Sequence, residues 1–200
     1  MQNTEFEMKN QSLLFTKPKT FSIKKKRDFK RLLQKTVKLD TAHSKTILIG
    51  MEFDKSDSER NFLFEEILEG LGELNNIQVV IIGQSKEHLN EYKNIKYLAN
   101  SPKNVELLSK CVDLYLLPKN QTEEEACLKY GTPSIYFESE LYNGMLSAFH
   151  PLEETGNSFP IFKKNKWHLL EAIIRAKETY GFPYDWSSIC KNAFSVGQSN

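Results

Sequence analysis

The stretch "TEEEACLKYGTPSIYF", residues 122–137, contains a complete junction between a helix and a strand. Three acidic residues open it, and negative side chains are favourable in the first turn of a helix, where the helix dipole is positive. Gly131 can adopt the left-handed conformation that ends a helix, and Pro133 cannot continue one. The apolar run from Ser134 to Phe137 then has the character of a buried strand. The stretch therefore predicts half of a βαβ unit.

The same alternation of helix and strand extends along most of the chain. The apolar runs predicted to be strands cover residues 45–51, 77–83, 95–99 and 112–117. The helices predicted between and after them cover residues 59–74, 86–92, 103–110, 163–182 and 186–194. The strand segments are continuous apolar runs, as in a parallel sheet that is covered on both faces. The chain is therefore predicted to be an α/β protein with a single Rossmann-like, doubly wound parallel sheet.

The amino-terminal end differs from the rest in charge and in periodicity. Residues 1–38 contain eleven basic and three acidic residues, whereas the remainder contains sixteen basic and twenty-three acidic residues. Residues 1–22 are predicted to form a flexible basic tail, residues 23–196 the domain, and residues 197–200 a second tail. The string "KKKR" at 24–27 lacks interleaved aromatic residues, so a solvated helix face is favoured over a nucleic-acid patch.

Composition excludes several classes of protein. The three cysteines have no metal-ligand spacing and the four histidines are far apart, so neither a metal nor another cofactor is expected. Two of the cysteines lie in apolar runs, which indicates buried thiols in a reducing compartment. No apolar run is long enough to span a membrane, and the first thirty residues lack the apolar core of a signal peptide. These features predict a cytoplasmic protein without a membrane or nucleic-acid partner.

The loops that follow the strands are the candidate ligand-binding segments, since ligands bind beyond the carboxyl ends of strands in open parallel sheets. Helices open shortly after most of these loops, so phosphate is the expected anion. Neither G-x-G-x-x-G nor G-x-x-x-x-G-K is present, which excludes the dinucleotide and P-loop fingerprints. Gly83 is either a turn residue with positive φ or a point of close approach to a ligand. Glu123, Glu124 and Glu125 are interpreted as a solvated first turn of a helix.

Taken in order, residues 24–195 resemble the C-terminal half of a bacterial glycogen or starch synthase, a glycosyltransferase of the GT-B type. The piece "CVDLYLLPKNQ" is similar to the family's "GADLFLMPSR", and "ACLKYGTPSIYF" is similar to "ALRYGTPPIV". Further along, "ETGNSFPIF" is similar to "GTGNGFVF". The resemblance implies the GT-B C-terminal fold and a nucleotide-sugar partner of the ADP- or UDP-glucose class. It places β-strand residues 134–137 beside the nucleotide-sugar cleft.

The resemblance also assigns binding residues, and no catalytic ones. Gly83, Gln84 and Ser85 would lie near the base or ribose, and Glu123 near the position of a family glutamate that contacts the donor sugar. The residues expected near the phosphates and sugar are Lys119, Thr122, Ser139 and Leu141.

This sequence departs from the family at the cations and the turn that hold the donor diphosphate. The Arg and Lys that follow the first strand in the family have only Lys55 and Arg60 as counterparts, out of register. The phosphate-binding "TGGL" turn falls on residues 138–141, where only Leu141 matches. The acceptor-binding half has no counterpart in the chain, so an acceptor-binding protein partner would be needed. Three hypotheses remain: a nucleotide-sugar-binding domain that is inactive alone, a scaffold or regulatory partner without a donor site, and an unrelated α/β binding module.

Overall fold

The computed structural model describes residues 18–42, 45–53, 56–84, 87–89, 91–138 and 144–199. Most of the predicted amino-terminal tail, together with Lys55, Ser85, Ser139 and Leu141, lies outside these residues.

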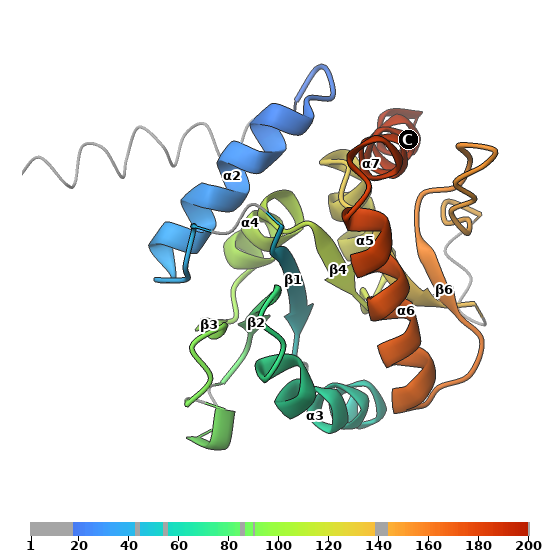
Figure 1. Ribbon diagram of the computed structural model, residues 1–200. Coiled ribbons are helices and arrows are strands. Elements are labelled where there is room, and N and C mark those ends of the chain that lie inside the picture. Colours follow the sequence, from blue (N-terminus) through green and yellow to red (C-terminus); the bar gives the residue numbers. More distant parts are fainter. Residues whose placement is uncertain are drawn as a thin grey trace, which may run out of the picture.

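The described chain contains one parallel sheet in the order β3-β2-β1-β4-β5-β6. Its strands are β1 (Ile47–Glu52), β2 (Ile77–Ile82), β3 (Ile95–Leu98), β4 (Leu114–Leu116), β5 (Ser134–Phe137) and β6 (Phe159–Ile161). The chain starts in the middle of the sheet at β1, builds outward to β3, and then crosses to β4 on the other side (Figure 1). This is the strand order of a doubly wound Rossmann-like sheet, so the predicted fold class is confirmed.

Helices cover both faces of the sheet (Figure 1). They are α2 (Ile23–Thr36), α3 (Ser58–Gly72), the 3-10 turn η1 (Glu87–Leu89), α4 (Pro102–Cys111), α5 (Gln121–Lys129), α6 (Lys166–Tyr180) and α7 (Pro183–Ser199). Side chains from α3 and α6 pack on one face, and side chains from α2, α4 and α5 pack on the other. Helix α7 packs against both α5 and α6, and it continues to Ser199, within the segment predicted as a tail.

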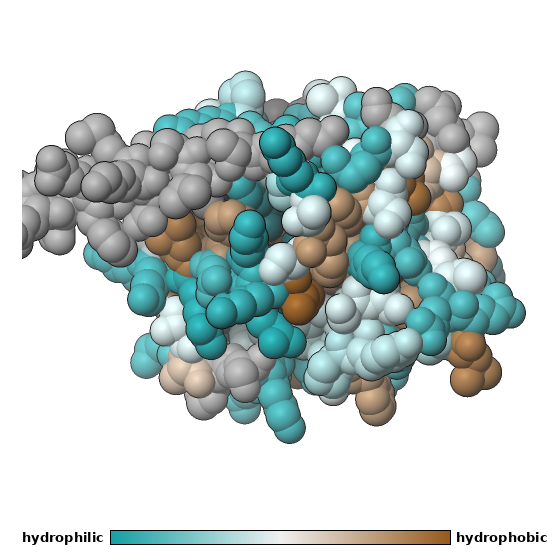
Figure 2. Space-filling model, turned by 90° about the horizontal axis from the view of Figure 1, so that it is seen from above, coloured by the Kyte–Doolittle hydropathy of each residue, from teal (hydrophilic) through white to brown (hydrophobic). Residues whose placement is uncertain are grey.

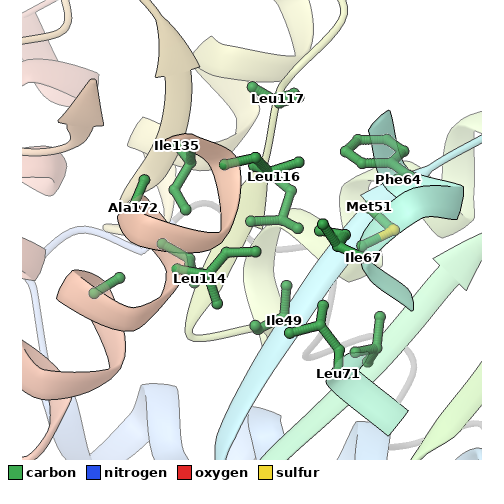
Figure 3. Packing of buried hydrophobic residues seen from close by; sticks show 14 of the residues in the cluster. Ile49, Met51, Phe64, Ile67, Leu71, Leu114, Leu116, Leu117, Ile135 and Ala172 are labelled. Carbon is green, nitrogen blue, oxygen red and sulfur yellow. The ribbon is translucent and has the colours of Figure 1, made fainter. Parts of the chain in front are cut away.

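The two buried clusters follow from the alternation of side chains along fully buried strands. In β1, Ile47, Ile49 and Met51 face the layer of α3 and α6, whereas Leu48 faces the layer of α2 and α4. Every residue of β1 and β2 is buried, as the continuous apolar runs predict. Figure 3 shows the first cluster, in which Leu116 and Ile135 from adjacent strands meet residues of α3 and α6.

The junction between α5 and β5 has the predicted geometry. Gly131 has φ +65° and donates its N–H to the carbonyl of Leu128. A Cβ atom at this position would lie 2.7 Å from the carbonyl oxygen of Cys190 in α7, so only glycine fits. The prediction of buried thiols is also confirmed, because all three cysteines are buried.

Strand β6 was not predicted, because it is three residues long and has a proline at its centre. Pro160 cannot donate a backbone hydrogen bond, which is tolerated here because, among the described strands, β6 pairs with β5 alone and forms an edge of the sheet. The carbonyl of Pro160 accepts a hydrogen bond from Arg175 of α6 at 2.9 Å.

The interpretation of "KKKR" as a solvated helix face is wrong for Lys26, which is buried. Lys30, one turn further along the helix, is buried as well. Lys26 and Lys30 are 5% and 6% exposed. Lys30 Nζ donates to Asp113 Oδ2, to the carbonyl of Thr46 and to the hydroxyl of Tyr180. Helix α2 lies along the amino ends of the strands, where carboxylate and carbonyl oxygens need donors. Lys26 Nζ donates to the hydroxyl of Thr132, two residues before β5, so both lysines anchor α2 to segments that lead into strands.

Truncation of the central strands is expected to destabilise the domain. Each of Ile49→Ala, Ile81→Ala, Leu116→Ala and Ile135→Ala removes a fully buried side chain and should lower the free energy of unfolding by about 2–5 kcal/mol in denaturant titrations. Leu152→Ala is the matched control, because Leu152 is fully exposed, and it should change stability by less than about 0.5 kcal/mol. Losses below about 1 kcal/mol at most of the four core positions would contradict the strand assignments.

Candidate functional site

The strand order places the candidate site where β1 and β4 lie side by side. The chain leaves β1 toward one edge of the sheet and leaves β4 toward the other, so the loops after these strands diverge and open a crevice at the carboxyl edge. Glu52 is the last residue of β1, and Lys119 follows β4 by three positions. The side chains of these two residues meet across the crevice.

Lys119 is shared between two carboxylates. Its Nζ lies 2.9 Å from Oε1 of Glu52 and 3.3 Å from Oε1 of Glu123. Its backbone N–H donates to the other oxygen of Glu123 at 2.9 Å, and Asn100 donates to Glu52 Oε1 at 3.3 Å. We call Glu52, Lys119 and Glu123 the switch-point cluster. The ammonium group is thus held in place from two sides.

Both carboxylates of the switch-point cluster are buried, whereas the lysine reaches the surface. Glu52 and Glu123 are 5% and 4% exposed. Oε2 of Glu52 and Oε1 of Glu123 accept no hydrogen bond within the described chain, although the latter is in ion-pair contact with Lys119. Burial raises the pKa of Glu123 to about 7, and neighbouring Glu52 adds to this effect. Burial alone would lower the pKa of Lys119, but the hydrogen bonds and charges of the two carboxylates outweigh it and raise that pKa.

Local backbone structure fixes these side chains. Asn120 caps α5 by accepting the N–H of Glu123 at 3.0 Å, while the carboxylate of Glu123 reaches back to the N–H of Lys119, one residue before the cap. Leu117 has φ +47°, and its carbonyl accepts a hydrogen bond from Arg60 Nη1 at 2.8 Å. Arg60 also pairs with Asp57 at 3.3 Å. Arg60, one of the two out-of-register counterparts of the family cations after β1, therefore supports the turn after β4.

A pocket of about 440 Å³ adjoins the switch-point cluster. It is lined by Ser56, Asp57, Ser58, Glu59, Lys119 and Asn120, from the first turn of α3 and the loop before α5. Its wall combines one cation, two carboxylates and two hydroxyl groups. The pocket is therefore open to a polar ligand but is not strongly positive.

The predicted site residues are only partly brought together. Lys119 and Glu123 are in direct contact, whereas no hydrogen bond or ion pair within the described residues joins Gly83, Gln84 or Thr122 to them. Thr122 is exposed on the first turn of α5.

Gly83 follows β2 and has φ +147°, and a Cβ there would lie 3.0 Å from Cβ of Phe53. Its role as a turn residue is confirmed. A substitution at Gly83 would therefore disturb the fold as well as any ligand.

The sequence does not point to Glu52, because a single acid at the end of a buried strand resembles the start of a polar loop. The interpretation of Glu123 and Glu124 as solvated is wrong, since Glu124 is 0% exposed and Glu123 is nearly so. The hydroxyl of Ser134 donates to both oxygens of Glu124, at 3.0 and 2.9 Å. Burial nevertheless raises the pKa of Glu124 to about 8. Glu125, on the outer face of α5, is exposed as expected.

No group of three or more histidine, cysteine, aspartate or glutamate side chains in the described residues could hold a metal ion. Among the same residues, no helix is both long and apolar enough to cross a membrane.

Comparison with known proteins relates this geometry to glycosyltransferases. The chain is 28% identical to the glycogen synthase of Fervidobacterium nodosum over 196 residues, covering 89% of the chain and 39% of that protein. Its fold matches the catalytic domain of starch synthase IV from Arabidopsis thaliana, bound to ADP and acarbose, with a TM-score of 0.71 at 17% identity. That match covers 85% of the chain and 38% of the synthase domain.

A second solved structure identifies the part of the enzyme that is matched. The C-terminal domain of a group 1 glycosyltransferase from Francisella tularensis aligns with a TM-score of 0.61 and 9% identity, over 94% of the chain and 96% of that domain. The chain has the C-terminal GT-B fold and resembles the glycogen synthases. No protein-family model matches the sequence of this glycosyltransferase-like domain. It spans about two fifths of the length of the synthases that it matches, 39% and 38%.

The buried acids of α5 predict a dependence of stability on pH. Their pKa values, about 7 for Glu123 and about 8 for Glu124, exceed the ordinary value of 4.5, so between these limits the folded chain holds protons that the unfolded chain releases. The free energy of unfolding should therefore decrease as pH rises from about 5 to about 8.

Thermal unfolding of Glu124→Gln should show a smaller loss of Tm over this pH range than the wild type, because the amide does not titrate. Glu125→Gln on the exposed face is the control and should keep the wild-type dependence. An identical pH dependence in wild type and Glu124→Gln would contradict the assignment of a raised pKa to Glu124.

Proposed function

We propose that this glycosyltransferase-like domain binds a nucleotide sugar of the ADP- or UDP-glucose class and does not transfer the sugar on its own. The position of the switch-point cluster carries this proposal, because ligands of doubly wound sheets bind at the crevice where it lies. The starch synthase with the same fold was solved with ADP, and Anabaena HepE, with a TM-score of 0.59, with UDP and glucose. Gly83 and Gln84, after β2, would contact the base or ribose.

The phosphates would meet an unfavourable charge distribution. Lys119 already neutralises parts of Glu52 and Glu123, and Arg60 is engaged by Asp57 and by the carbonyl of Leu117. A departing diphosphate needs positive charge that is fixed before the reaction, and loss of one such stabilising group typically costs about 10²–10³ in rate. The cluster supplies at most one cation, and that cation is shared. Weak donor binding and no effective transfer follow from this arrangement.

The acceptor presents a second requirement. Positioning an acceptor in line with the donor sugar is worth roughly 7–11 kcal/mol. The synthases similar to this chain are more than twice as long as the part it matches, so the acceptor would have to be held by an additional segment or a separate acceptor-binding protein. An active enzyme, on this proposal, is an assembly of this domain with such a partner.

A scaffold or regulatory partner without a donor site is the second candidate. The observation that favours it is the same shared Lys119, because a lysine held by two carboxylates can serve structure alone. The two candidates differ in whether a nucleotide sugar binds, which can be measured directly.

The first prediction concerns turnover. The purified chain should release no ADP or UDP above background from ADP-glucose or UDP-glucose in the presence of glycogen or maltooligosaccharides, in a coupled assay for nucleoside diphosphate. A bacterial glycogen synthase in the same assay is the positive control. Turnover at a rate comparable with that control would refute the proposed inactivity.

The second prediction concerns donor binding and isolates the switch-point cluster. Glu52→Gln retains an oxygen that Lys119 can bond to but removes one negative charge. Calorimetry should therefore show donor binding strengthened roughly tenfold or more, because nearby like charges repel by more than about 1 kcal/mol at an effective dielectric constant near 20. Lys119→Ala should weaken binding, and the exposed Glu125→Gln is the matched control for charge. Absence of donor binding in both wild type and Glu52→Gln would favour the scaffold.

A further inference from the structure

A second pocket lies at the opposite edge of the sheet from the switch-point cluster. It has a volume of about 370 Å³ and is formed by α2, the segment before β1 and the turn between α6 and α7. Lys30 in its wall bonds the carbonyl of Thr46, just before β1, and the carboxylate of Asp113, just before β4. Because all strands are parallel, these contacts place the pocket at the amino edge. We call it the amino-edge pocket.

The amino-edge pocket concentrates positive charge that no ion pair among the described residues neutralises. Arg27, Arg31 and Lys45 line it, all three are exposed, and none forms an ion pair within the part of the chain that the structure describes. No acidic residue is among the described residues of its wall. Lys30 is the exception among the cations, because Asp113 balances its charge. Three cations on one concave surface repel each other unless an anion is present.

Two hydroxyl groups add uncharged donors. The oxygen of Tyr180 accepts a hydrogen bond from Lys30 at 2.9 Å, and its own proton has no acceptor within the described residues. Thr41 contributes an exposed hydroxyl at the rim. Trp186, packed edge-on against Tyr180 with ring centroids 5.0 Å apart, forms an apolar part of the wall. The pocket thus offers charged donors, neutral donors and an apolar surface in one place.

We propose that the amino-edge pocket binds a small phosphorylated metabolite, separately from the nucleotide-sugar crevice. Its volume falls within the range of about 300–1,000 Å³ typical of small-molecule sites. Arginine side chains bind phosphate through paired hydrogen bonds, and Arg27 and Arg31 are one helical turn apart on the same face of α2. The phosphate group sits between these arginines and Lys45, and Tyr180 donates to the same group.

The shape and the aromatic residues of the amino-edge pocket distinguish it from a nucleic-acid surface. Single-stranded nucleic acid binds along an extended groove with exposed aromatic rings for stacking. Here Trp186 is only 3% exposed, so its ring forms part of the pocket wall and is not accessible for stacking with a base. Figure 2, which looks from above onto this edge, shows hydrophilic side chains interspersed with apolar patches.

The test measures the binding of pyrophosphate and of glucose 6-phosphate to the full chain by calorimetry at low salt. The wild type should bind at least one of these probes, and Arg27→Ala/Arg31→Ala should weaken that binding at least tenfold. Lys24→Ala/Lys35→Ala is the matched control: it removes two charges from exposed positions of the same helix that do not line the pocket, and it should change affinity less than twofold.

Lys119→Ala, at the carboxyl edge, should leave probe binding unchanged even if donor binding fails. Three results would contradict the proposal. Neither probe binds the wild type, both double variants lose affinity to the same extent, or Lys119→Ala lowers the affinity for the probes. The proposal would also be overturned if a single-stranded oligonucleotide bound more tightly than the probes and displaced them. Circular dichroism of each variant establishes that it is folded. If the double variant unfolds, the single variant Arg27→Ala is measured instead, and it should weaken binding about threefold or more.

Discussion

Strands β1 and β4 lie side by side at the centre of the sheet. At each end of these strands, an ion pair between a lysine and a buried carboxylate links them. At the amino edge, Lys30 binds Asp113, which also accepts the backbone N–H of Leu48 at 2.8 Å. At the carboxyl edge, Lys119 binds Glu52. Removing one partner of a buried pair leaves an uncompensated charge, which is far more costly than the net worth of the pair. The register of β4 against β1, and with it the position of both pockets, depends on these two contacts.

The two pairs have different consequences for function. The amino-edge pair is enclosed and balanced, so Arg27 and Arg31 beside it, which form no ion pair in the described part of the chain, remain available to a ligand. The carboxyl-edge pair occupies the crevice where a donor would bind, and it places two carboxylates around the cation that a diphosphate would need. On the proposed function, the chain keeps the fold of a glycosyltransferase domain while its crevice offers a diphosphate one shared cation. This difference between fold and site is why similarity to glycogen synthases does not by itself assign their activity to this chain.

The fold could be predicted from the sequence because its signals are local. The apolar runs at β1 and β2 and the Gly-Thr-Pro hinge specify strands and a helix end without reference to distant residues, whereas β6 is too short and carries Pro160. The site could be predicted only in part, because its contacts are not local. Glu52 and Lys119 are 67 positions apart, and Lys30 is 83 positions from Asp113 and 150 from Tyr180. A run of lysines or glutamates gives no indication of such partners, so the sequence predicts solvated side chains for Lys26, Glu123 and Glu124, which are buried.

The central claim is that the crevice between β1 and β4 still receives a nucleotide sugar, weakly. Titration of the ¹⁵N-labelled chain with ADP-glucose, followed by amide chemical shifts, tests it most directly, because each affected residue is identified. The account predicts saturable shifts at the amides of Gly83, Gln84, Lys119 and Asn120, with fast exchange, and none at Arg27 or Arg31. Shifts confined to other surfaces, or no shifts at a donor concentration of several millimolar, would contradict it.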